Sequence, residues 1–189
     1  NLSEVMQRPQ TSPLKIKDKM MKKFTMLSLV AAVALTASFA SAATLTWDGV
    51  SSQWWNANTG STNWNDGVTP LTFWTSGDDA IFDSSSTVKT VWAGTGAGAV
   101  IVGNMTFNDA GYTIAAGGGT TTNNLTLTTT TITANSDATI SAQMIGTGSL
   151  TKEGTGRLLL TTQESTYSGG TIVNAGTLAL GKGGGTGSI

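Results

Sequence analysis

The sequence predicts an all-β protein built as a parallel β-solenoid, and three features of the 189-residue chain support this prediction. Only 11% of the residues are charged, whereas Gly, Thr and aliphatic residues are abundant, a composition typical of short strands and tight turns. Aliphatic residues recur with period two in short phrases, most of which end at Gly or Asn. No apolar pattern of helical period and useful length follows residue 43.

Two residue types that carry much enzyme chemistry are missing, since the chain has no Cys and no His. A disulfide framework and thiolate metal sites are therefore excluded. Ser-His-Asp and Cys-His catalysis are excluded too, because both depend on a histidine base. Beyond residue 43, four Lys or Arg residues stand against nine Asp or Glu residues, without the basic cluster of a nucleic-acid interface. We expect no nucleic-acid partner.

Residues 20–43 have the three parts of a secretory signal peptide: a pair of lysines, a run rich in Leu, Val and Ala, and an Ala-Ser-Ala cleavage site. The apolar run is too short to span a membrane, which needs about 20 apolar residues. We expect a signal-peptide helix here, with cleavage after Ala42 or, as second choice, after Ala43. Residues 1–19 are interpreted as a stretch upstream of the true start. No second hydrophobic span follows, so we expect a mature piece that is exported and not itself anchored.

A Trp-rich zone at residues 44–87 opens the predicted mature piece. Five of the six Trp residues alternate there with Asn, Asp, Gly and Ser, so its strands must be short. Two interpretations stay open. The favoured one is a compact N-terminal cap, since a small sheet needs large side chains to bury enough area. The other is a sugar-binding surface, whose candidate glycan-stacking residues are Trp54, Trp55, Trp64 and Trp74.

Residues 88–189 are a series of short strand phrases, predicted at 99–107, 112–117, 124–134, 138–144, 149–154 and 157–162 and in two final Gly-Thr-aliphatic phrases. The pairs Leu125/Leu127, Leu158/Leu160 and Leu178/Leu180 each indicate one strand face.

An antiparallel sandwich and a parallel solenoid can both be built from such phrases. The final phrases begin at Gly170 and Gly176, only six residues apart, and hairpin dipeptides are scarce, which favours the solenoid. On this interpretation the two phrases are two faces of one turn, with Ile172 and Leu178 filling the interior.

An ordered set of phrases in residues 146–181 resembles the autotransporter-associated β-strand repeat, or passenger-associated repeat, of bacterial secreted proteins. The phrases are Gly-Ser-Leu-Thr-Lys from Gly148, Gly-x-Gly from Gly154, Leu158 with Leu160, Tyr-Ser-Gly-Gly-Thr from Tyr167, and Asn-Ala-Gly-Thr-Leu from Asn174. Upstream, TWDG, NWN, GDDAIFD and GNMTFNDAGYTI are similar to what often precedes the first such repeat. The resemblance implies a right-handed parallel β-helix on an exported or surface-displayed protein, with no catalytic residues and no cofactor.

These observations predict a non-catalytic, structural or adhesin-like passenger segment of a bacterial protein, secreted or displayed at the cell surface or outer membrane. Its expected partners are a Sec-type export machinery and, at the surface, glycans or host cells. The alternative is a polysaccharide-binding module of a secreted glycan-degradation system. No barrel-like pattern follows Gly181, so we expect either a longer natural protein or another export route.

The acidic residues do not form a recognisable catalytic or metal site in the sequence. Asp78 and Asp79 are adjacent, so on an extended strand they point to opposite faces and cannot serve one site. Glycoside hydrolysis needs two carboxyl groups about 5–9.5 Å apart. The ligand spacing of a calcium loop is absent as well. We therefore expect Asp side chains to cap turns, and no catalytic, cofactor or metal residues.

Overall fold

The computed structural model describes residues 42–50, 52–55, 62–68, 72–94, 99–117, 124–161 and 165–181. These residues belong to a single unit, Ser41–Ile189. The upstream stretch and most of the expected signal peptide lie outside the described residues. Within them every regular element is a β-strand, and no helix has the length and apolar character needed to cross a membrane.

The strands form three sheets, called A, B and C here. Sheet A has the spatial order β14 (Thr171–Val173), β12 (Leu150–Glu153), β9 (Thr130–Ala134), β6 (Met105–Phe107), β3 (Asp79–Phe82), β1 (Thr44–Trp47) and β2 (Trp64–Asn65). Sheet B has the order β15 (Thr177–Leu180), β13 (Arg157–Leu160), β10 (Ala138–Ile140), β7 (Tyr112–Ala116) and β4 (Thr90–Ala93). Sheet C consists of β11 (Met144–Ile145), β8 (Leu125–Leu127) and β5 (Val100–Val102).

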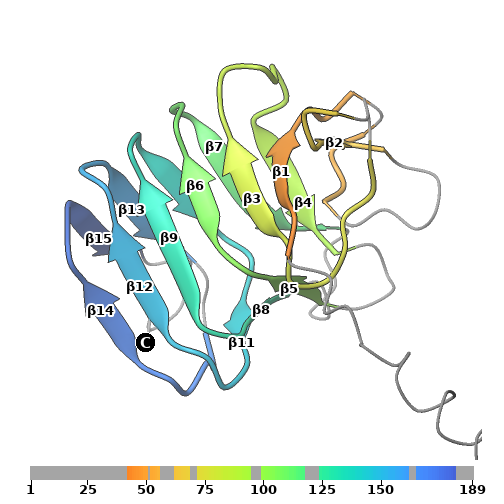
Figure 1. The fold of residues 1–189 in the computed structure, drawn as a ribbon. Coiled ribbons are helices and arrows are strands. Elements are labelled where there is room, and N and C mark those ends of the chain that lie inside the picture. Colours follow the sequence, from red (N-terminus) through yellow and green to blue (C-terminus); the bar gives the residue numbers. More distant parts are fainter. Residues whose placement is uncertain are drawn as a thin grey trace, which may run out of the picture. The chain divides into compact units, whose positions relative to one another are not determined.

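The chain visits the sheets in the repeating order C, A, B, which defines a coil. The complete coils are β5-β6-β7, β8-β9-β10 and β11-β12-β13, preceded by β3-β4 and followed by β14-β15. Figure 1 shows the strands of sheet A side by side, with those of sheet B behind them. Successive coils pair in parallel in all three sheets, whereas β1 and β2 are antiparallel. The fold is thus a β-solenoid of about four turns, and the solenoid prediction is confirmed over the sandwich.

Inward side chains form columns because each coil repeats the register of the coil before it. In sheet B one column contains Val91, Ile114, Ile140, Leu160 and Leu180. In sheet A the corresponding column contains Leu45, Ala80, Met105, Ile132, Lys152 and Val173. Most of these side chains are buried and belong to one hydrophobic core. Burial of apolar side chains against the apolar side chains of the next coil supplies the main driving force for stacking.

The two Gly-Thr-aliphatic phrases are strands β14 and β15, which lie in sheets A and B of the same coil, as predicted. Leu178 pairs with the buried Leu158 and points inward. The expectation for Ile172 was wrong. Ile172 pairs with the outward-facing Thr151 and is 54% exposed, because the alternation along β14 assigns Thr171 and Val173 to the inner face.

Three of the predicted phrases each contain two strands of different sheets. Residues 99–107 contain β5 and β6, residues 124–134 contain β8 and β9, and residues 138–144 contain β10 and the start of β11. The first break falls at Gly103, where a Cβ atom would lie 2.6 Å from the carbonyl oxygen of Gly77. A corner packed this closely on the preceding coil leaves no room for a side chain.

Gly154 shows the same requirement at the corner that connects sheets A and B. Its φ is +76°, and a Cβ atom there would lie 2.5 Å from the carbonyl oxygen of Ala134 in the preceding coil. Left-handed backbone and close packing therefore both demand glycine at this position. Gly111 has a φ of +86°, but a Cβ atom there would meet nothing within 4 Å.

We predict that Gly154→Ala lowers the free energy of unfolding more than Gly111→Ala does. Both substitutions incur the conformational cost of a left-handed Ala, about 1–2 kcal/mol, but only the first also pushes a methyl group into a neighbouring coil. Urea unfolding of the two variants measures the difference. Equal losses would show that coil-to-coil contact at this corner contributes nothing.

Candidate functional site

Many of the charged and amide side chains lie where the chain passes from sheet A to sheet B. The segments that form this polar corner are 83–89, 108–111, 135–137, 154–156 and 174–176, together with the residues that flank them in β12 and β13. They come from successive coils and lie one above the next, because the strands on either side of them pair in register. The polar corner is the natural place to look for chemistry.

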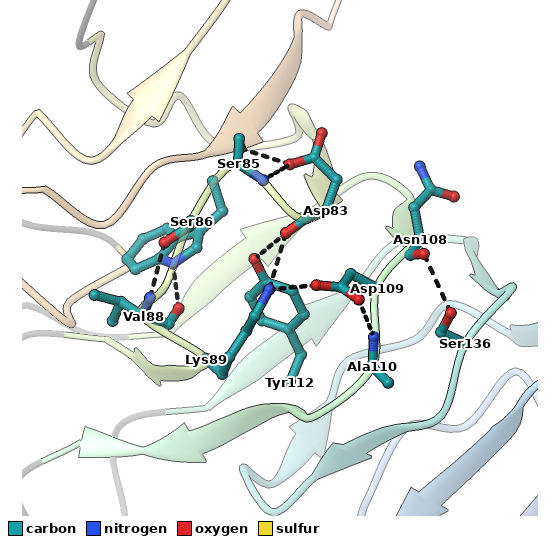
Figure 2. A network of polar contacts seen from close by, with 11 residues as sticks. Asp83, Ser85, Ser86, Val88, Lys89, Asn108, Asp109, Ala110, Tyr112 and Ser136 are labelled. Carbon is teal, nitrogen blue, oxygen red and sulfur yellow. Dashed lines mark hydrogen bonds and ion pairs between the residues drawn. The ribbon is translucent and has the colours of Figure 1, made fainter.

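Lys89 is the centre of the first network in the polar corner (Figure 2). Its Nζ lies 2.8 Å from Oδ2 of Asp109 in the next coil and donates to the carbonyl oxygen of Asp83 at 3.0 Å. The same ammonium lies 4.1 Å from the ring centroid of Tyr112, whose hydroxyl donates to the Asp83 carbonyl at 2.7 Å. These contacts join the corners of two successive coils.

The titration behaviour of this network does not suit acid–base catalysis. The hydrogen bond from Lys89 and that from the Ala110 amide lower the pKa of Asp109. Burial by itself lowers the pKa of Lys89, but Asp109 and Tyr112 outweigh it and the pKa is raised. Burial raises the pKa of Tyr112. At neutral pH the network is therefore a fixed ion pair beside a neutral phenol, with no group near its midpoint.

The later coils are joined at the polar corner by other polar side chains. The Asn135 amide donates to Oδ1 of Asn108 at 2.8 Å, and the Ser136 hydroxyl donates to the Asn108 carbonyl at 3.1 Å. Asn174 donates to the Glu153 carboxylate at 2.6 Å. Each contact joins one coil to the next, as the Lys89 network does.

Lys152 occupies a position in the inward column of sheet A that is otherwise apolar. It is fully buried, at 0% exposure, and lies in register between Ile132 and Val173. Its Nζ donates to the carbonyl oxygens of Glu153 at 2.5 Å and Gly154 at 2.8 Å. It also donates to that of Ala175, in the next coil, at 3.1 Å. The ammonium therefore caps carbonyl groups of two coils.

Burial lowers the pKa of Lys152, and the charge of Glu153 opposes this shift. Lys152 ends the Gly-Ser-Leu-Thr-Lys phrase of the repeat, but its inward position was not predicted. The sequence signal for its position was the alternation of inward and outward residues along the strand. Lys152 stands two positions after the inward-facing Leu150, so it must also face the interior.

Carboxylate oxygens of the acidic residues accept hydrogen bonds from backbone amides at turns, as predicted. Oδ1 of Asp66 accepts from the Val68 amide, and Oδ1 of Asp83 accepts from the Ser85 amide. Asp78 is buried and Asp79 is partly exposed, since they occupy alternate positions. Among the described residues no three acidic side chains come together as metal ligands would.

The Trp-rich zone forms a ring cluster beside β1 and β3. Trp47, Trp55 and Trp64 are buried at 0–1% exposure, and the centroids of Trp55 and Trp64 are 5.1 Å apart. Trp54 and Trp74 are partly exposed. A buried ring presents no face to a sugar, so glycan stacking by this surface depends on Trp54 and Trp74.

Backbone pairing ties this zone to the edge of sheet B. The Trp55 amide donates to the Trp92 carbonyl at 2.9 Å, and the Trp92 amide donates to the Gln53 carbonyl at 2.7 Å. Trp54 itself packs edge-on against Trp92, with ring centroids 4.9 Å apart, and contacts Gly117. The edge of β4 therefore has partners from this zone.

We predict that Lys152→Ala destabilises the fold more than Lys152→Met. Both variants leave partly buried carbonyl groups without this donor, at up to about 1–3 kcal/mol for each group, but the methionine keeps most of the apolar packing that the lysine stem provides. Urea unfolding, with the exposed Arg157→Ala as the control, measures both losses. A Met variant as stable as the parent chain would contradict a stabilising role of the ammonium.

Comparison with known protein families places a specific repeat in the region of the last four strands. A family model of the passenger-associated transport repeat matches residues 150–180, the segment from β12 to β15. The matched segment therefore contains the sheet A and sheet B strands of two successive coils. No solved structure matches the chain significantly.

One curated relative extends the similarity beyond this repeat. The chain is 42% identical over 82 residues to the adhesin BmaC autotransporter of Brucella suis biovar 1 (strain 1330). The aligned part is 43% of this chain and only 2% of that adhesin. The resemblance expected from the sequence is confirmed: the chain carries the passenger-associated transport repeat and is similar to part of an autotransporter adhesin.

Proposed function

We propose that the chain is a non-catalytic passenger segment of an exported bacterial protein, displayed at the cell surface, with a structural and adhesive role. The relative is named as an autotransporter adhesin, and the repeat is one associated with passengers. The observation that carries the proposal is that the charged side chains of the polar corner are engaged by the fold itself. The buried ammonium of Lys152 and the ammonium of Lys89 both bind groups of their own coil and of the next one.

A rod that grows by stacking needs its free edges protected. We propose that the Trp-rich zone is the N-terminal cap of the rod. In support, β2 pairs with the edge of β1, and residues 53–55 pair with the edge of β4. We further propose right-handed coils, because parallel strands joined by a crossover have that hand almost without exception.

Export by a Sec-type machinery, through a signal peptide that ends at Ala42, completes the proposal. Its partners at the surface are glycans or the surfaces of host or neighbouring cells. The chain spans only 2% of the relative's length, so these roles are proposed for the segment as part of a longer protein.

A polysaccharide-binding module is the second candidate, and one observation favours it. Trp54 and Trp74 are the two candidate stacking residues of the Trp-rich zone whose rings remain partly exposed. Exposed rings of this kind can stack on sugar faces. This binding mode would place the ligand at the N-terminal end of the rod.

One binding experiment separates the two functions. The purified chain is incubated with a panel of bacterial and host polysaccharides and with fixed cells, and both retention and release of sugar ends are measured. Trp54→Ala and Trp74→Ala test the aromatic surface, and Phe73→Ala is the matched control.

For the adhesive passenger we expect cell-surface binding that survives both Trp substitutions, with no release of sugar. Loss of glycan binding by roughly tenfold or more, equivalent to about 1.4 kcal/mol, in both Trp variants but not in Phe73→Ala would favour the polysaccharide module. Steady release of sugar ends would contradict both.

A further inference from the structure

Asp78 is a buried carboxylate whose surroundings are unusual for its charge. It is only 5% exposed and directly precedes β3. Oδ2 accepts a hydrogen bond from the Thr75 amide at 2.9 Å, and Oδ1 accepts one from the Ala43 amide at 2.9 Å. Within the described residues the only ion pair joins Lys89 and Asp109, so Asp78 has no basic side chain as partner there.

The donor to Oδ1 belongs to the residue that follows the expected cleavage point. Ala43 is held in place by strand pairing, since its carbonyl accepts from the Asp79 amide at 2.8 Å and Thr44 pairs with Asp79 at the start of β1. The position of the Ala43 nitrogen is thus fixed by the fold and not by the residues that precede it.

We propose that Asp78 is the receptor for the processed N-terminus: cleavage after Ala42 creates an ammonium on Ala43 that forms an ion pair with this carboxylate. This inference rests on the proposed export and processing of the chain. Hydrolysis adds water across the peptide bond, leaves the carboxylate on Ala42, and frees an α-amino group on Ala43. That amine takes up a proton at neutral pH, since free α-amino groups ordinarily have a pKa of about 8.

The geometry distinguishes the two expected cleavage points. A chain that begins at Ala43 keeps the contact with Asp78 and gains a charge in it. A chain that begins at Thr44 loses both the Ala43–Asp78 and the Asp79–Ala43 hydrogen bonds. A charge-assisted hydrogen bond is about twice as strong as a neutral one, so processing after Ala42 would fasten β1 to β3.

The test uses the mature chain prepared to begin at Ala43, with either a free or an acetylated amine. Acetylation removes the charge but keeps an N–H group on Ala43. Both forms are made in the parent sequence, in Asp78→Asn and in Asp79→Asn. Asp79 is the matched control, because its carboxylate accepts from the Asn104 amide instead. Urea unfolding at low salt gives the folding equilibrium constant of each form.

We expect acetylation to lower this constant by about tenfold in the parent chain and in Asp79→Asn, and by less than about twofold in Asp78→Asn. An equal effect of acetylation in the Asp78 variant would overturn the proposal. If that variant does not fold, the pH dependence decides. The advantage of the free amine over the acetylated form in the parent chain should be complete below about pH 8, the ordinary pKa of an α-amino group, and should disappear as the pH is raised and the amine loses its proton. An advantage that is unchanged at high pH would overturn the proposal.

Failure of the proposed function gives a different result. A chain that is not exported would refute that function and leave the stability of the Ala43-initiated form unaffected. Conversely, N-terminal sequencing of an exported chain that begins at a residue other than Ala43 would overturn this inference while leaving the passenger role intact.

Discussion

The structure depends on one constraint, which is that every coil must turn at the same places as the coil below it. The backbone groups of the solenoid strands pair mainly with the strands of neighbouring coils, so a coil that turns one residue early would break the register of three sheets. The corners therefore determine the register in which the coils stack, while the columns of inward aliphatic residues supply most of the stabilisation. Glycine and polar groups gather at the corners for this reason.

The polar corner meets this constraint in different ways along the chain. Lys89 and Asp109 form an ion pair between coils, the side-chain amide of Asn135 donates a hydrogen bond to that of Asn108, and the buried Lys152 ammonium donates to three carbonyl groups. Such groups would be costly to bury without partners. Since the neighbouring coil supplies at least one of the partners in each case, the contacts that satisfy these groups also hold the coils together.

The sequence predicts the stack well and its details less well. Period-two Leu pairs and closely spaced phrases indicated parallel strands. Both signals could be recognised because each lies within a short stretch of the sequence. The inward position of Lys152 and the outward position of Ile172 could not be assigned from residue type, since each reverses the ordinary preference for burial. Burial of Trp55 and Trp64 depends on contacts with distant strands, such as those to Phe82 in β3, which no local pattern reveals.

Parallel pairing of successive coils defines this fold, and inter-strand proton contacts measured by nuclear magnetic resonance can establish or exclude it. The structure predicts backbone contacts between Thr113 and Thr139 and between Thr139 and Leu159, with the strands running in the same direction. It also predicts that sequence neighbours such as β12 and β13 do not pair, because they lie in different sheets. Antiparallel contacts between β12 and β13 would show a hairpin sandwich and exclude the solenoid.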